Sequence, residues 1–282
     1  MMELLSVIVP NYNKQEFLST CLDSILKQTY PNIEIIIVDD CSQDSSQMII
    51  REYEKKYSNI RAIFLEKNQG VSHARNLGIE YAAGTYVTML DSDDFYYNPE
   101  KLEKEMSLLE KHQGEGVAYS YRIVVDEYGN PIYSERKNIE RYVSGNVFYH
   151  FLTEKDAFGF VQRDYCLPKE YIKSVGGYHE NESYYEDYDL LLRLSFRYPL
   201  YYTNCDGTAY RFMSSGLSVN KRENDGKQFR VPQMIRLRYM KKLRGRQRIQ
   251  AYMIWCVESL KLEIRIMGRK VLSILRTREK KK

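Results

Sequence analysis

The chain has 282 residues, 43% of them hydrophobic, and a formal net charge of +4 at pH 7. This length suits one large domain or two ordinary ones, and the hydrophobic fraction is sufficient for a packed core. The five cysteines are scattered and contain no Cys-x-x-Cys pair, which argues against a disulfide framework or a zinc site. There is no run of 18 apolar residues, so no transmembrane helix is predicted. The acidic residue Glu3 is followed directly by a predicted strand, so no signal peptide is predicted. We therefore expect a cytoplasmic protein.

The net charge conceals a strong asymmetry along the chain. Residues 226–282 contain 18 Lys or Arg and 3 Glu, whereas the rest of the chain contains 24 basic and 35 acidic residues. A basic segment of this kind usually faces an anionic partner, either nucleic acid or lipid headgroups. With one Trp and no recognisable nucleic-acid motif in the segment, we expect no nucleic-acid partner.

The first half of the chain alternates short apolar runs with segments of helical periodicity. This alternation predicts βαβ units and a parallel sheet. Pro10 is expected to stop the first strand, and Gly84 to cap the third helix. The predicted strands are Leu4–Val9, Ile33–Val38, Ile60–Leu65 and a run from Tyr86, and the predicted helices are Gln15–Gln28, Ser45–Tyr57 and Gly70–Ala83.

The pattern is weaker in the second half. A helix is predicted from Pro99 to Lys111, a strand over Val117–Val125 and a hairpin tip at residues 126–130. Residues 134–165 are expected to form a loop with short helices. Beyond them we expect a turn at Gly176-Gly177-Tyr178, a helix over Asp187–Arg197 and two short strands near 200–203 and 207–212. The predicted domain is 1–225, with halves 1–115 and 116–225.

Residues 226–282 are predicted to form a basic, amphipathic helical tail. Apolar residues recur at helical spacing from Ile249 to Ile274, and basic residues lie on another face. Two interpretations stay open. The helix from 246 to 282 either packs on the domain or lies on an anionic membrane surface, which would make the protein peripheral at the inner face of the cell membrane.

Acidic residues follow two of the predicted strands. Asp91, Asp93 and Asp94 come directly after the Tyr86 run, and Asp39 and Asp40 end the second strand. The carboxyl ends of parallel strands meet at one edge of a sheet, where such folds bind ligands. Clustered carboxylates repel one another, and a divalent cation relieves that cost. The alternative is a solvated acidic turn with Asp94 as a helix N-cap.

Two further charged positions could complete a site at this edge. Arg75 is a candidate counter-charge to phosphates, or a structural ion-pair partner of the acids. Asp187, next to Glu186 at the start of a helix, is either a general base or an N-cap.

Five blocks follow one another between residues 4 and about 220: 6–13 with 24–31, 36–44, 68–78, Asp91-Ser92-Asp93, and Gly176-Gly177-Tyr178 with 186–190. In this order they resemble the family 2 glycosyltransferases, which have the GT-A fold, and Asp91-Ser92-Asp93 resembles their Asp-x-Asp metal motif. Met213 lies where relatives often have a histidine that can join the metal site, so the resemblance implies weak metal affinity without nucleotide.

The resemblance implies the role of each candidate residue. Asp91 and Asp93 would bind Mn²⁺ or Mg²⁺, Asp187 would be the catalytic base, and Glu186 would orient the loop or the acceptor. The remaining nucleotide-sugar contacts would come from Pro10, Tyr12, Asp39, Asp40, Arg75, Asp91 and Ser92.

The implied reaction transfers a sugar, with inversion, from a nucleotide-sugar donor (a UDP-sugar) to a hydroxyl of a glycan or lipid-linked acceptor. Cell-surface polysaccharide synthesis is the expected setting, and a homo-oligomer is an open expectation. Two alternatives stay open: a metal-dependent nucleotidyltransferase, and an inactive nucleotide-sugar-binding module. The first would leave Glu186 and Asp187 without a role, and the second would release no nucleoside diphosphate.

Overall fold

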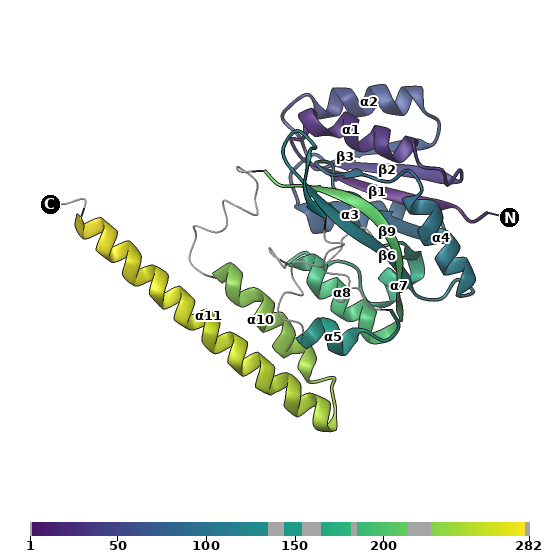
Figure 1. Cartoon of the computed structure of the whole chain (residues 1–282). Coiled ribbons are helices and arrows are strands. Elements are labelled where there is room, and N and C mark those ends of the chain that lie inside the picture. The colour runs from purple at the N-terminus through teal and green to yellow at the C-terminus, as the bar shows by residue number, and fades with distance from the viewer. Residues whose placement is uncertain (1, 135–143, 154–164, 182–184, 214–226, 280–282) are drawn as a thin grey trace. The chain divides into compact units, whose positions relative to one another are not determined.

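The computed structural model describes residues 2–134, 144–153, 165–181, 185–213 and 227–279 (Figure 1). They belong to two compact units. The first comprises Met1–Val147 and Phe160–Met213, and the second comprises Phe148–Gly159 and Ser214–Lys282. The boundary predicted at residue 225 lies outside the described residues, so the proposed domain limits stay a prediction.

The first unit is built on a five-stranded sheet with the order β3-β2-β1-β4-β8. The strands β1 (Leu5–Asn11), β2 (Ile33–Asp39), β3 (Ile60–Phe64) and β4 (Tyr86–Met89) are parallel, and β8 (Leu167–Pro168) is antiparallel to β4. This confirms the predicted βαβ arrangement. Pro10 does not end β1, which continues to Asn11 with Pro10 opposite Val38.

Helices cover both faces of this sheet, as the apolar runs of its strands predict. Figure 1 shows α1 (Gln15–Leu26) and α2 (Ser46–Lys56) on one side and α3 (Val71–Tyr81) on the other. Val7, Val9, Ile35 and Ile37 belong to the core that contains α1. A Cβ at Gly78 on α3 would lie 2.4 Å from Ile8 Cγ2, so α3 packs directly against the opposite face of β1.

Gly84 has a different role from the predicted one. The C-cap of α3 is Ala82. A Cβ at Gly84 would lie 2.5 Å from Ser6 Oγ and 2.6 Å from the Leu4 carbonyl oxygen, so glycine is needed here because the chain passes close to β1.

A second, four-stranded sheet has the order β5-β9-β6-β7. It consists of β5 (Phe95–Tyr96), β6 (Val117–Val125), β7 (Pro131–Ser134) and β9 (Leu200–Arg211), and α4 (Lys101–Lys111) packs on β6 and β9. The two strands predicted near 200–203 and 207–212 are one strand with register shifts against β6. Asn204 lies at the irregular part of this strand and has a positive φ of 53°. Asparagine is common in turns, so the sequence predicts a turn here and two strands instead of one.

Two helices of the first unit frame the acceptor-side blocks. They are α7 (Lys169–Ser174) and α8 (Glu186–Arg197), and both glycines of the intervening Gly176-Gly177 turn have positive φ. Helix α8 starts at Glu186, one residue before the predicted start. Most of the predicted 134–165 loop lies outside the described residues.

The second unit contains the helices α5 (Phe148–Thr153), α10 (Lys227–Met240) and α11 (Gly245–Glu279). The predicted helical extension is therefore confirmed, as two long helices rather than one. Trp255 Nε1 donates to the Gln233 carbonyl oxygen at 2.8 Å, and Arg230 forms a two-point ion pair with Glu263 at 2.8 and 2.7 Å. These contacts hold α11 against α10. Within the described residues, no helix is long and apolar enough to cross a membrane.

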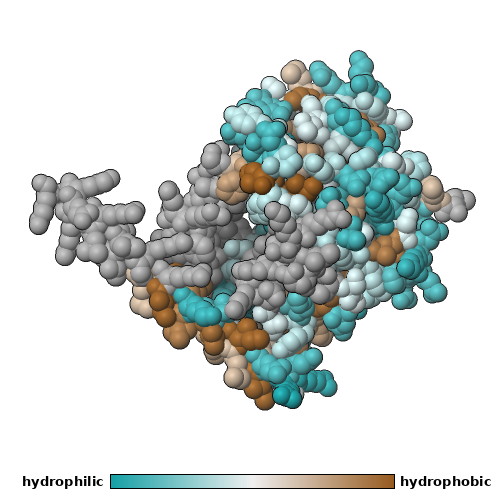
Figure 2. Space-filling view, in the orientation of Figure 1, coloured by the Kyte–Doolittle hydropathy of each residue, from teal (hydrophilic) through white to brown (hydrophobic). Residues whose placement is uncertain are grey.

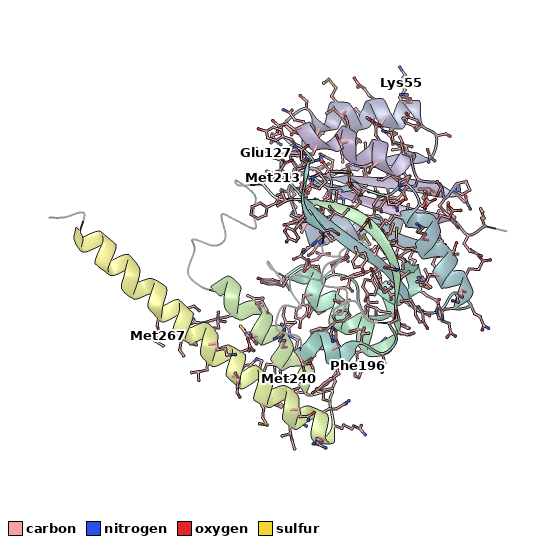
Figure 3. All side chains as sticks on the ribbon, in the orientation of Figure 1. Lys55, Glu127, Phe196, Met213, Met240 and Met267 are labelled. Atoms are coloured by element: carbon pink, nitrogen blue, oxygen red, sulfur yellow. The ribbon has the colours of Figure 1, made fainter. Side chains whose placement is uncertain are left out.

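Another face of α11 is apolar and exposed. Figure 2 shows hydrophobic surface along this helix. Of the two methionines labelled on these helices in Figure 3, Met267 on α11 is exposed and Met240 on α10 is buried. The exposed residues recur at intervals of three and four and are 51–64% exposed: Ile249, Met253, Val257, Leu260, Ile264 and Met267.

Candidate active site

The carboxyl ends of β1 and β2 are joined through buried polar side chains. Asn11 Nδ2 donates to Asp39 Oδ2 at 2.8 Å, and Asp39 Oδ1 accepts from the Ser42 backbone and the Gln47 side chain, both at 3.0 Å. Asp39 is completely buried. The structure therefore gives Asp39 a role in fixing the loop after β2, and its predicted part in nucleotide binding stays a prediction.

Asp40 fixes the start of α3. Its two carboxylate oxygens accept from the backbone N–H groups of Gln69 at 2.7 Å and Gly70 at 2.8 Å. Gly70 is the N-cap of α3 and has a φ of 90°, which favours glycine. The first amides of a helix lack partners within the helix, and a carboxylate satisfies them well. A base contact by Asp40, as predicted from the sequence, would have to use its remaining lone pairs.

Arg75, on α3, joins the two halves of the candidate site. Its Nη2 lies 2.6 Å from Asp91 Oδ1, and its Nη1 lies 2.9 Å from Glu186 Oε1. Arg75 is 1% exposed, and its guanidinium carbon lies 5.2 Å from the centre of the Tyr178 ring. A buried arginine needs such partners, because an unpaired charge in this position would be costly. One side chain thus holds the Asp-x-Asp turn and the start of α8 together.

The acids that follow β4 form a compact cluster. Oxygen atoms of Asp91, Asp93 and Asp94 all lie within 4.8 Å of one another. Lys14 Nζ lies 2.7 Å from Asp93 Oδ2. Carboxylate oxygens are the ligands that Mg²⁺ and Mn²⁺ prefer, so Asp91 and Asp93 fit the predicted metal site.

Arg211, at the end of β9, forms hydrogen bonds to two residues of this cluster and to a neighbouring turn. Its backbone N–H donates to Asp94 Oδ1 at 2.8 Å, its Nε to the Asp93 carbonyl oxygen at 2.9 Å, and its Nη1 to the carbonyl oxygen of Glu127 (labelled in Figure 3) at 2.7 Å. Asp94 is 6% exposed, and Arg211 contacts its carboxylate, whereas Arg211 contacts Asp93 through the backbone carbonyl. Arg211 therefore fixes the turn that presents Asp91 and Asp93.

Asp187 lies in the first turn of α8, beside the Arg75 partner Glu186. The N-cap Tyr185 has φ 60° and ψ 30°, a left-handed conformation that costs energy for a bulky residue. Asp187 is 9% exposed. The pKa of the buried Tyr178 hydroxyl is raised mainly by burial, with further increases from the charges of Asp91, Asp187 and Glu186. The charges of both the Asp-x-Asp turn and the start of α8 therefore act on one buried hydroxyl.

The Gly-Gly-Tyr turn and Glu180, which follows it, also contact α3. Asn76 Nδ2 donates to Glu180 Oε1 at 3.0 Å, and His73 Nδ1 lies 3.2 Å from Glu180 Oε2. A Cβ at Gly177 would lie 2.7 Å from Asn76 Oδ1, and Gly177 has a φ of 67°. Glycine is thus required by both the close contact and the backbone conformation.

The remaining predicted site residues differ in accessibility. Tyr12 is 44% exposed at the end of β1, whereas Pro10 and Ser92 are buried. The structure brings Arg75, Asp91, Glu186 and Asp187 together, and their catalytic and binding roles stay predictions. Sequence reasoning missed Lys14, Asn76 and Arg211. Asn76 lies inside the 68–78 block and Lys14 directly follows the 6–13 block, whereas Arg211 lies in none of the blocks, two residues before Met213.

This arrangement of strands, helices and strand-end acids defines a GT-A fold, as comparison with solved structures confirms. The chain is similar to Staphylococcus aureus TarS residues 1–349 in complex with UDP-GlcNAc, with a TM-score of 0.68 and 19% identity over 89% of this chain and 70% of that chain. It is also similar to the mannosyltransferase PcManGT of Pyrobaculum calidifontis in complex with GDP-Man and Mn²⁺, with a TM-score of 0.64 and 14% identity over 97% and 81%. At these identities the likeness shows the fold alone.

Residues 6–168 match the model of glycosyl transferase family 2, and the chain belongs to that family. TuaG of Bacillus subtilis, named for teichuronic acid biosynthesis, is 43% identical over 106 residues, which cover 38% of this chain and 42% of TuaG. The amylovoran biosynthesis glycosyltransferase AmsB of Erwinia amylovora is 29% identical over 201 residues, which cover 67% of this chain and 62% of AmsB. The matches thus span less than two thirds of either relative.

Proposed function

We propose that the protein is an inverting glycosyltransferase that uses a UDP-sugar and transfers its sugar to a hydroxyl of a glycan or lipid-linked acceptor. Family membership supports sugar transfer, and the names of TuaG and AmsB support a role in cell-surface polysaccharide synthesis. UDP-GlcNAc in the TarS complex supports a nucleotide-sugar donor, although PcManGT binds GDP-Man. The screen described below therefore compares UDP-sugars with GDP-sugars.

The observation that carries the proposal is the position of Arg75 between Asp91 and Glu186. It brings the Asp-x-Asp turn, on the donor side, next to the residue that precedes Asp187. A nucleotidyltransferase whose nucleophile is the ionised phosphate of a sugar phosphate needs no carboxylate at the Asp187 position, whereas attack by a sugar-acceptor hydroxyl requires a proton acceptor.

On the donor side, Tyr12 and Asp40 would contact the nucleoside, and Arg75 would supply positive charge next to the diphosphate. Asp91 and Asp93 would hold a divalent cation, Mn²⁺ or Mg²⁺. When bound, such a cation offsets the negative charge that the leaving diphosphate gains, a contribution of several kcal/mol. The Arg211 contacts fix the acidic turn on which these metal ligands lie.

On the acceptor side, Asp187 would accept the proton of the attacking hydroxyl. The acceptor oxygen forms a bond to the anomeric carbon, and the bond from that carbon to the diphosphate oxygen breaks, with its electron pair leaving on the nucleoside diphosphate. A single displacement with one base and no covalent intermediate inverts the anomeric configuration. Glu186 is held by Arg75 and would orient the loop or the acceptor rather than take the proton itself.

A screen of nucleotide sugars tests this proposal. The full chain is incubated with UDP-, GDP- and other nucleotide sugars plus a glycan acceptor mixture, and released nucleoside diphosphate is measured with and without chelator. We expect release from a UDP-sugar that needs the divalent cation, and proton NMR of the product should show the opposite anomeric configuration. Retention of the anomeric configuration, or release of sugar 1-phosphate in place of nucleoside diphosphate, would contradict the proposal. No release with any donor would favour a binding module.

We also propose that α11 attaches the enzyme to an anionic membrane surface, where a lipid-linked acceptor would lie. The exposed apolar stripe of α11 defines one face, and exposed basic side chains accompany it at Arg246, Arg248 and Lys261. With 18 basic and 3 acidic residues in 226–282, repulsion disfavours a second copy of this segment as the occupant. Anionic lipid supplies both the apolar layer and the opposite charge.

A further inference from the structure

Lys14 forms an ion pair that the reaction outlined above does not use. Its ammonium lies 2.7 Å from Asp93 Oδ2, and the two side chains are 28% and 24% exposed. Within the residues that the structure describes, Lys14 Nζ pairs with no other carboxylate. The proposed metal ligand is therefore already neutralised by a cation of the protein itself.

The backbone that carries Lys14 is fixed. Its N–H donates to Ser46 Oγ at 3.2 Å, and the preceding Asn13 is held by hydrogen bonds to Ser42 Oγ at 2.9 Å and from the Gln43 backbone at 2.7 Å. These bonds join the loop after β1 to the loop after β2. The side chain therefore extends from a fixed point at the sheet edge, and only its flexible four-carbon chain can move.

The two acids of the Asp-x-Asp motif differ in how firmly they are paired. Arg75 is 1% exposed and is anchored to both Asp91 and Glu186, so it cannot leave Asp91 without breaking a buried network. The Lys14–Asp93 pair is partly exposed, and pairs of this kind contribute little. A divalent cation on Asp93 would therefore displace Lys14 and leave Arg75 in place.

We propose that Lys14 is a mobile cation of the donor site, which pairs with Asp93 until metal and nucleotide bind and then pairs with the donor diphosphate. This inference rests on the proposed function. Displacement by a divalent cation frees the ammonium next to the newly added negative charge of the diphosphate. Lys14 thus competes with the metal alone but favours metal and nucleotide together, and it couples the two binding events.

The test uses the full-length Lys14→Met variant, with Lys27→Met as control because Lys27 is exposed beyond the other end of α1. Mn²⁺ binding without nucleotide, measured by electron paramagnetic resonance, should tighten about two- to fivefold in Lys14→Met. UDP binding at saturating Mn²⁺, measured by calorimetry, should weaken at least about tenfold. Lys27→Met should change neither, and Lys14→Arg should retain tight UDP binding. If Lys14→Met does not fold, Lys14→Gln takes its place.

The opposite signs of the two effects distinguish this proposal from a structural role. Unchanged Mn²⁺ binding, or weaker binding of both ligands, would overturn it. If wild type and Lys14→Met bind UDP equally while wild type transfers sugar, the Lys14 inference fails and the proposed function stands. If wild-type protein binds neither Mn²⁺ nor UDP, both fail.

Discussion

Asn76 and Tyr178 exchange two hydrogen bonds across 102 residues of sequence. Asn76 Nδ2 donates to the Tyr178 carbonyl oxygen, and the Tyr178 N–H donates to Asn76 Oδ1, both at 2.8 Å. This pair fixes the Gly-Gly-Tyr turn on α3 and places the Tyr178 ring 5.2 Å from the Arg75 guanidinium carbon. The helix that presents Arg75 to the donor-side acids therefore also positions the acceptor-side turn.

Asn76→Ala should destabilise the first unit. It removes both hydrogen bonds to Tyr178, together with the exposed one to Glu180, and leaves the Tyr178 backbone without these partners, a loss of about 1–3 kcal/mol in the free energy of unfolding. Urea denaturation measures it. Asn59→Ala is the matched control, because Asn59 makes one exposed hydrogen bond to the Ile33 carbonyl oxygen and should cost less. Equal losses in the two variants would show that the Asn76–Tyr178 hydrogen bonds contribute no more to the free energy of unfolding than one exposed hydrogen bond.

Glu180 should make stability depend on acid pH. The Asn76 hydrogen bond, assisted by His73, lowers the pKa of Glu180 below its ordinary value. A carboxylate with a lowered native pKa stabilises the fold above its unfolded pKa of about 4.3, and this contribution is lost as the pH falls through the native pKa. The difference in unfolding free energy between wild type and Glu180→Gln should therefore shrink from pH 6 to pH 3. A constant difference would contradict the assignment.

Asp93→Asn should abolish stimulation of sugar transfer by divalent cations while leaving the fold intact. Asp93 lies at a strand end outside the core, so loss of its charge removes a metal ligand without creating a cavity. Mn²⁺ titration of activity and thermal unfolding are the two measurements. Glu52→Gln, which removes one negative charge from the exposed face of α2, serves as control. Full activity of Asp93→Asn in chelator would show that sugar transfer needs no divalent cation.

Leu260→Glu should weaken binding to anionic vesicles. Leu260 is 63% exposed in the middle of the apolar face of α11, and a carboxylate there opposes both burial in lipid and attraction to it. Vesicle co-sedimentation at low and high salt measures the effect. Gln247→Glu adds the same charge outside the stripe, and it should reduce binding less. If both variants bind like wild type at low salt, the face does not contact lipid.

The parallel sheet could be predicted because its strands are short apolar runs between helices of regular period. Val117–Val125 matches β6 residue for residue, since this run, rich in β-branched and aromatic residues, is bounded by Gly116 before it and by the turn residues 126–130 after it. β9 was divided in two because Asn204 and Gly207 are turn residues in most contexts, whereas pairing with β6 holds them in one irregular strand. Tertiary pairing here outweighs local preference.

The candidate site was only partly predictable for a similar reason. Strand-end acids can be located from the order of elements, since parallel strands share a carboxyl edge. The partner of each acid depends on contacts between residues far apart, such as Arg75 with Glu186 or Lys14 with Asp93. Spacing in the sequence does not reveal these pairs. It likewise does not reveal that Asp40 accepts from two amides at the start of α3, and the predicted contact of Asp40 with the nucleotide stays a prediction.

The central claim is that Asp187 removes the proton of the acceptor hydroxyl in a site assembled by Arg75, and single-turnover kinetics of Asp187→Asn test it most directly. The substitution keeps the size of the side chain but cannot accept a proton. We predict a loss of about 10²–10⁴-fold in the rate of sugar transfer, with the Kd for the nucleotide-sugar donor unchanged. Transfer by Asp187→Asn at the wild-type rate, with equal donor affinity, would contradict the account.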